Sequence, residues 1–129
     1  MSKNYLKKII AQNPKDLQII AALISESKAK VSDRKYLPKN KIFLLSIERK
    51  EKENNNDHIN SIIKFSFIDV CKSKNVDQKN SEKILKLISI DVLKKNHNYE
   101  IIVVFSENSY ISLQSEIIEA ELIDQQKVE

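Results

Sequence analysis

The sequence predicts an α+β fold, with one N-terminal helix packed on an antiparallel sheet of six to eight short strands. Residues 14–27 carry apolar side chains at helical spacing. Several later segments are instead rich in β-branched residues, or alternate apolar and polar residues with a period of two. The 129 residues show no internal repeat and no long linker, so we expect a single domain over 1–129.

The predicted helix has a well-marked beginning. Asn13 can accept a free backbone N–H, Pro14 suits the first helical position, and Asp16 places a negative charge near the positive end of the helix dipole. The apolar stripe consists of Leu17, Ile20, Ala21 and Ile24, with Ile19 and Leu23 beside it. A stripe of this width predicts a helix that lies flat on a large apolar surface.

The strands are recognised by their apolar patterns and by the turn residues between them. A short strand is expected at 5–11, and a hairpin of 29–37 and 42–47 around a turn at 38–41. Three further strands are expected at 62–70, 101–105 and 110–113; the first has a bulge between Phe67 and Ile68, and the second is covered on both faces. Loops or turns are expected at 50–58, 72–82, 94–98 and 107–109.

Two segments allow more than one interpretation. Residues 84–93 fit a helix with one apolar face and equally a strand with alternating apolar positions. Residues 116–123 fit a final strand or a short helix. As a strand, this segment places Glu119 and Glu121 on one face, which we interpret as the solvent side of an edge strand or as a docking surface for a basic partner.

The absence of glycine excludes several catalytic motifs. Glycine is used where the backbone takes a positive φ or approaches a ligand closely. The sequence has none, so the dinucleotide motif GxGxxG, the phosphate loop GxxxxGK[ST] and the nucleophile elbow GxSxG do not occur. These enzyme classes are therefore excluded, the lack of a catalytic motif favours a protein that is not an enzyme, and we expect no cofactor.

The charge and the cysteine content limit the classes of partner and the cellular compartment that we expect. Residues 1–50 hold twelve Lys or Arg against four acidic residues, which gives +8, and residues 51–129 hold ten against fourteen, which gives −4. Arginine occurs only at Arg34 and Arg49 while Lys, Asn and Ile dominate, a bias typical of AT-rich genomes that weakens the charge signal. A single cysteine, Cys71, and apolar runs too short for a secretion signal or a membrane span predict a cytoplasmic protein.

Two stretches of the chain carry a family resemblance: residues 30–43, KVSDRKYLPKNKIF, and residues 105–124, FSENSYISLQSEIIEAELID. They are similar to the KVGDLAYLPRERRF and FAGGGAIRLDVECIEARLAD stretches of an uncharacterised alphaproteobacterial family, a domain of unknown function. The segments 13–27 and 81–91 also match it in order and spacing. The resemblance implies a small cytosolic α+β protein without an assigned activity, and it favours a strand for 84–93.

The chain departs from this family after Arg49. The family places aromatic residues where this chain has Lys50 and Lys52. A function in which those rings stack on a base or a ligand is therefore not expected here.

The sequence holds few of the histidine and cysteine residues that catalytic and metal-binding sites use. His58 and His97 are the only histidines, both are predicted in polar loops, and no spacing joins them to Cys71. One cysteine and two distant histidines do not make a zinc site, and we interpret residues 50–58 as a solvated acidic loop rather than a cation site. We expect no metal.

We hypothesise a non-enzymatic binding or protein-interaction module that acts through a protein partner or by self-association. The alternative is RNA or DNA binding by the basic hairpin at residues 28–52, and a third, less favoured hypothesis is an enzyme whose Asp, Tyr, Arg and Glu side chains meet on folding. The candidate binding residues are Asp33, Tyr36, Lys39, Lys41, Arg49 and Glu116.

Overall fold

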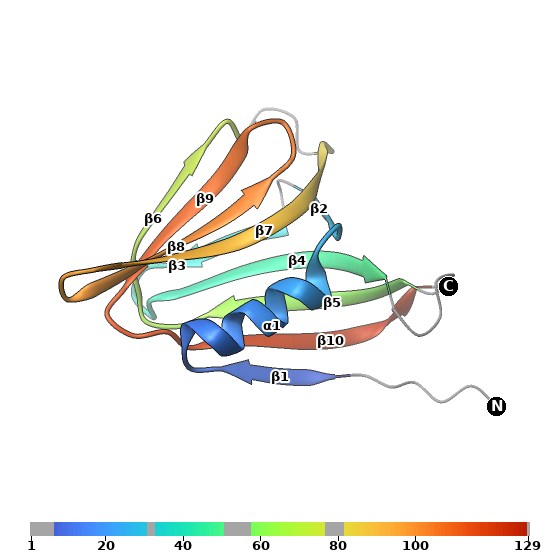
Figure 1. Ribbon diagram of the computed structural model, residues 1–129. Coiled ribbons are helices and arrows are strands. Elements are labelled where there is room, and N and C mark those ends of the chain that lie inside the picture. Colours follow the sequence, from blue (N-terminus) through green and yellow to red (C-terminus); the bar gives the residue numbers. More distant parts are fainter. Residues whose placement is uncertain (1–6, 31–32, 51–57, 77–81, 129) are drawn as a thin grey trace.

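The computed structural model describes residues 7–30, 33–50, 58–76 and 82–128, and it consists of one helix and ten strands over these ranges (Figure 1). In chain order the elements are β1 (Lys8–Ala11), α1 (Pro14–Ile24), β2 (Lys28–Lys30), β3 (Arg34–Leu37), β4 (Ile42–Lys50), β5 (His58–Phe65), β6 (Ile68–Lys74), β7 (Ile84–Lys95), β8 (Asn98–Phe105), β9 (Ser109–Ser115) and β10 (Ala120–Val128).

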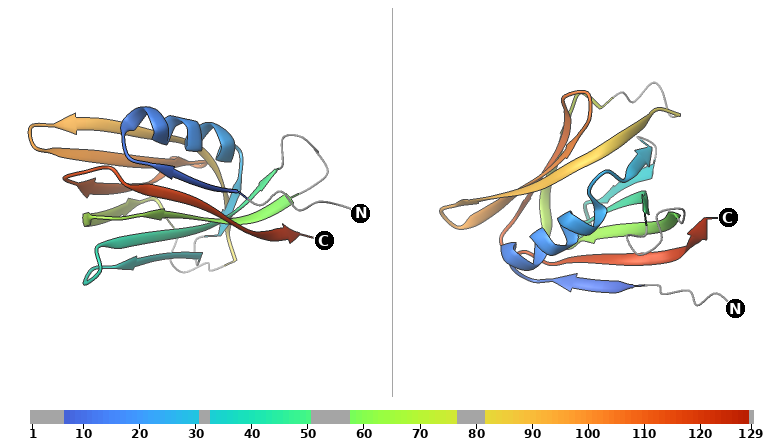
Figure 2. Two further views of the ribbon diagram at one scale, coloured as in Figure 1. Left: turned by 90° about the horizontal axis from the view of Figure 1, so that it is seen from below. Right: turned by 45° about the vertical axis from the view of Figure 1, so that its right-hand side comes forward.

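All ten strands form one antiparallel sheet that bends into two layers. The strand order is β1-β10-β5-β4-β2-β7-β8-β9-β6, and β3 pairs with β4 beside β2. The sheet bends at β2, so β1, β10, β5, β4 and β3 make a first layer and β7, β8, β9 and β6 make a second layer (Figure 1). Seen from below, the five strands of the first layer lie side by side (Figure 2, left).

The two layers also meet at a corner between β5 and β6. The backbone N–H of Ile68 donates to the carbonyl oxygen of Lys41 on the other layer, at 2.8 Å. The hydroxyl of Tyr36 in β3 donates to the carbonyl oxygen of Ile68, also at 2.8 Å. Phe67 turns the corner with a φ of 60°, a left-handed conformation that is unusual for a bulky residue. The layers are therefore connected at both ends of the fold.

The helix α1 lies in the opening between the layers (Figure 2, right). The Asn13 side chain accepts the backbone N–H of Asp16 at 2.8 Å, which confirms the predicted cap. The Gln18 amide donates to the carbonyl oxygen of Ile90 in β7 at 2.9 Å and so joins the helix to the second layer. Glu26, with a φ of 70°, turns the chain from the helix into β2.

The core is aliphatic and lies between the layers. The predicted helix stripe is buried, but the stripe is narrower than predicted because Ile19 is 54% exposed. Phe43 and Phe65 contact each other with ring centroids 6.3 Å apart. The largest fully buried apolar side chains are Phe43, Phe65, Leu17, Ile20, Ile24, Leu45, Ile59, Ile63, Ile68, Leu87 and Ile90.

Several predicted boundaries were wrong. Over the described residues the sheet has ten strands rather than six to eight, and α1 follows β1, the short strand expected at 5–11, so the helix is not the N-terminal element. The helix also ends at Ile24, three residues before its predicted end at 27. The segment 29–37 falls in two separate strands, β2 and β3; both pair with β4, and β2 pairs with β7 as well.

The later segments differ from prediction because they pair with distant strands. Residues 62–70 are not one bulged strand: β5 ends at Phe65 and β6 begins at Ile68 in the other layer. Residues 84–93 lie in strand β7, as the family resemblance suggested. Strand β8 is buried on one face only, and β10 is an inner strand paired with both β1 and β5, not an edge strand. In the loop predicted at 50–58, residues 51–57 lie outside the described residues.

Two neighbouring isoleucines in α1 give a matched test of the core. Ile20 is fully buried, whereas Ile19 is 54% exposed. Ile20→Ala should lower the free energy of unfolding by about 2–5 kcal/mol because it leaves a cavity. Ile19→Ala should change it by less than about 0.5 kcal/mol. Urea denaturation of both variants measures this, and equal losses would contradict the assigned helix face.

Candidate functional site

The outer face of the first layer is not covered by any described helix or strand. Every strand belongs to the sheet, and α1 lies on the inner side (Figure 1). Along β4, Phe43 and Leu45 are buried, whereas Leu44 and Ser46 are only half-buried on the outer face. An antiparallel sheet commonly leaves one face open to solvent in this way.

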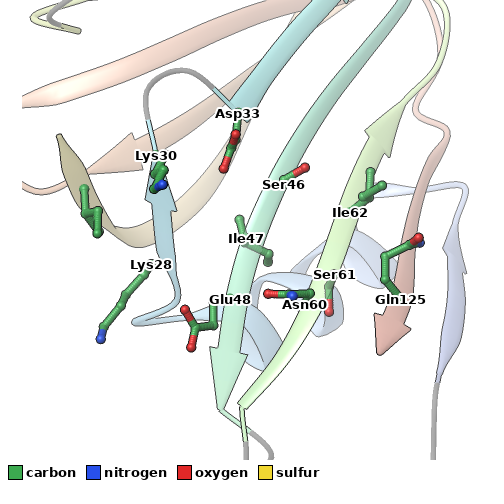
Figure 3. Close-up of a pocket in the computed structure, with 11 residues that line it drawn as sticks. Lys28, Lys30, Asp33, Ser46, Ile47, Glu48, Asn60, Ser61, Ile62 and Gln125 are labelled. Carbon is green, nitrogen blue, oxygen red and sulfur yellow. The ribbon is translucent and has the colours of Figure 1, made fainter. Parts of the chain in front are cut away.

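A hollow of about 430 Å³ opens on this outer face where β2 and β3 separate from β4 (Figure 3). Strand β2 meets β4 only through Lys28 and Glu48, and β3 pairs with β4 only up to Leu45. The intervening part of β4, at Ser46 and Ile47, therefore lies at the hollow. Its lining residues are Lys28, Lys30, Asp33, Ser46, Ile47, Glu48, Asn60, Ser61, Ile62, Ile84 and Gln125.

The lining of the hollow is suited to hydrogen bonding. Asn60 and Gln125 supply amides that both donate and accept, and both are exposed. Two of the charged groups have partners: Lys30 lies 3.6 Å from Glu82, and Glu48 lies 3.4 Å from the His58 ring. The hollow can therefore bind polar groups such as the amides and side chains of a peptide.

The lining holds two hydroxyls, those of Ser46 and Ser61. Nucleophilic catalysis needs a hydroxyl or thiol beside a base that can take its proton. The hydroxyl of Ser61 donates to the buried Asp124 carboxylate at 2.6 Å, so it points away from the hollow, toward the inner side of the first layer. No Cys or His is among the residues that line the hollow.

An aliphatic strip adjoins the hollow, and it consists of Leu37, Ile42, Leu44, Ile62 and Ile123. All five side chains are half-buried on the outer face. Ile62 pairs with Ile123 across β5 and β10, and Ile42 pairs with Leu37 across β4 and β3. Ile62 also lines the hollow, so the aliphatic strip and the hollow form one continuous surface.

Beneath this face lies a buried ion pair between Arg49 and Asp124. The Asp124 carboxylate accepts hydrogen bonds from Arg49 Nε at 3.0 Å and Arg49 Nη2 at 2.6 Å. It also accepts from Ser61 Oγ at 2.6 Å and from the backbone N–H of Lys7 at 2.8 Å. The side chains of Arg49 and Asp124 are 2% and 0% exposed. Burial alone would raise the pKa of Asp124, but these hydrogen bonds and the Arg49 charge outweigh it and hold the pKa below its ordinary value.

The six predicted binding residues do not form one site. Asp33 lines the hollow, Arg49 is buried in its ion pair, and Lys39 is exposed in the turn before β4. Tyr36, Lys41 and Glu116 lie together at the corner of the fold: the Asp69 carboxylate, 2.9 Å from Lys41, raises the pKa of that ammonium, and Glu116 and Tyr36 raise it further.

The histidines and the cysteine lie apart from one another. His58 begins β5 rather than lying in a loop, and His97 is exposed in the turn between β7 and β8. Cys71 is half-buried in β6, where burial raises the pKa of its thiol against the opposing charge of Arg34. In the described ranges, no group of three or more His, Cys, Asp or Glu is placed to hold a metal ion. The acidic residues 51–57 lie outside those ranges.

Sequence reasoning missed Asp124 and the aliphatic strip. Asp124 ends the pattern IEAELID on which the family resemblance rests, so its position was available as a signal. Its partner Arg49 lies 75 residues away, and no local pattern joins the two. The strip combines residues of four strands, and their common face follows only from the sheet register.

The ion pair predicts a large loss of stability on neutralisation. Asp124→Asn keeps the size of the side chain but leaves the buried Arg49 charge uncompensated. The free energy of unfolding should fall by about 3–5 kcal/mol. Asp91→Asn, at an exposed position of β7, is the matched control and should cost less than about 0.5 kcal/mol. A loss below about 1 kcal/mol for Asp124→Asn in urea denaturation would contradict the arrangement.

The lowered pKa of Asp124 also predicts a pH dependence. The ordinary value is 3.8, and the folded value lies below it. Between these two values the unfolded chain binds more protons, so the contribution of Asp124 is fully present above the unfolded pKa and is lost as the pH falls through the folded pKa. Urea midpoints measured from pH 6 down to pH 2 should fall more steeply for the parent than for Asp124→Asn. Parallel curves would show that this carboxyl is not the responsible group.

In the part of the chain that the structure describes, no helix has the length and the apolar character that a membrane span requires.

Comparisons with known proteins place the chain in a family. Searches of curated proteins and of solved structures found no match. A family model described as "Protein of unknown function (DUF2948)" matches residues 7–129, which confirms the expected membership in a family of unknown function. The chain therefore belongs to the DUF2948 family.

Proposed function

We propose that this protein is a cytoplasmic, non-enzymatic protein-binding module that contacts its partner through the outer face of the first layer. The observation that carries the proposal is the aliphatic strip on an uncovered sheet face, continuous with the polar hollow. Protein interfaces commonly have an apolar centre with a polar, hydrogen-bonding rim.

The arrangement of the two parts supports this function. Ile62 belongs to both, so a partner seated on the strip reaches the hollow without leaving the surface. Asn60 and Gln125, beside it in the hollow, can bond to the polar groups at the edge of a partner. The lining favours binding over catalysis because its buried hydroxyl, Ser61, is already bonded to Asp124.

The charges of the hairpin favour a protein partner over a nucleic acid. Nucleic-acid binding needs cations that are free to neutralise phosphates. Arg49 is buried against Asp124, Lys41 is 2.9 Å from Asp69, and Lys30 is 3.6 Å from Glu82. Two acids, Asp33 and Glu48, line the hollow among the remaining lysines. These pairs leave the 28–52 segment less positive than its composition suggests.

Site-specific photo-crosslinking in the native cell tests the proposal. A photoreactive amino acid replaces Ile62 in the strip or, as a control, Ile102, which is half-buried on the outer face of the second layer. We expect discrete cross-linked protein bands from position 62 and none from position 102, because only the first face is proposed to contact a partner.

The outcomes separate the alternatives. Bands from both positions, or from neither, would contradict a specific protein-binding face. A product from position 62 that nuclease removes would instead identify a nucleic-acid partner and overturn the proposal.

A further inference from the structure

We infer that the partner presents an amphipathic helix with acidic residues on both flanks of its apolar stripe, and that this helix lies along the aliphatic strip. The inference rests on the proposed function and specifies its partner. It follows from the shape of the strip, from its position on a sheet face, and from the two lysines beside it.

The strip has the length and direction of a short helix. It runs obliquely from Ile123 on β10, through Ile62 and Leu44, to Leu37 on β3. This path crosses three strand spacings and advances four residues along β4, a distance of about 20 Å. A helix rises about 1.5 Å per residue, so about 13 residues, or between three and four turns, would cover the strip.

A helix suits a sheet face better than an extended peptide does. An extended segment lying on aliphatic side chains would leave its own N–H and C=O groups without partners. Added strands bind at sheet edges, whereas the strip lies mostly on β10, β5 and β4, each of which has strand neighbours on both sides. A helix satisfies its backbone internally and buries an apolar stripe on a sheet, which is the usual packing of these two elements.

The charges beside the strip select an acidic helix. Lys64 pairs with Leu44 on one side, and Lys35 pairs with Leu44 on the other. Among the described residues neither lysine has a carboxylate within 4.0 Å; Glu121, the cross-strand partner of Lys64, lies 4.0 Å from Lys8 instead. Carboxylates on both flanks of a docked helix would therefore meet unpaired lysines. A second copy of this chain is less suited, because it presents the same excess of lysine.

Peptide display against the purified full chain tests the inference without naming a partner. A library of random 16-residue peptides is selected on the parent protein. We expect enriched peptides with apolar residues at i, i+4, i+7 and i+11 and acidic residues between them, which gain helical circular dichroism on binding. Parallel selection on Lys35→Glu/Lys64→Glu should enrich basic peptides instead.

Matched variants establish where the selected peptides bind. Lys35→Glu/Lys64→Glu should weaken the acidic peptides at least ten-fold, because both reversed charges then repel the helix flanks. Lys74→Glu/Lys86→Glu changes two exposed lysines of the second layer by the same charge and should alter the affinity less than two-fold. Far-UV circular dichroism of both variants checks that they fold like the parent.

Several results would overturn the inference. The selection would contradict it if no peptides were enriched on the parent, or if basic or extended peptides were. Equal effects of the two double variants on affinity would also contradict it. So would a dimer of the free protein that Leu44→Glu dissociates, because the strip would then be covered by a second copy. If position 62 still cross-links a protein in cells, the binding face stands and only the acidic helix is wrong. If position 62 cross-links nothing, the proposed function fails as well.

Discussion

The buried pair of Arg49 and Asp124 is the interaction on which the first layer depends. Arg49 comes from β4 and Asp124 from β10, and the carboxylate also binds Ser61 of β5 and the backbone of Lys7 beside β1. Strands β10, β4 and β5 and the residue that precedes β1 thus meet at one carboxylate. A slip of β10 by one residue would turn its side chains to the other face and leave a buried guanidinium without a partner. A buried ion pair adds little net stability compared with apolar packing, so we assign it the role of fixing register.

The same constraint determines the outer face that we propose for binding. With Asp124 held inward, the neighbouring Ile123 must face outward, where it joins the aliphatic strip. The register of β10 shifts immediately after Asp124, between Asp124 and Gln126, and Gln125 then reaches the hollow. The inward carboxylate and the outward binding surface are therefore two consequences of one register.

Features of the fold that depend on residues close together in the chain were predicted correctly from the sequence. The cap at Asn13 and the buried stripe of α1 depend on residues within one or two turns, and both were confirmed. Strand pairing depends on distant segments, so the predicted strand count was too low, the strand order was not predicted, and the break at Phe67 was predicted only as a bulge within one strand. Arg49 was assigned to a basic hairpin because its charge is visible in the sequence and its partner, 75 residues away, is not. The aliphatic strip was missed for the same reason.

A double-mutant cycle on Arg49 and Asp124 tests the central claim most directly. The free energy of unfolding is measured for the parent, Arg49→Met, Asp124→Leu and the double variant. If the two groups act as one buried pair, each single change should be strongly destabilising, and the double variant should lose about 2–3 kcal/mol less than the sum of the two single losses. A coupling energy below about 0.5 kcal/mol, with additive losses, would show that the two residues act independently and that the register of the first layer does not depend on them.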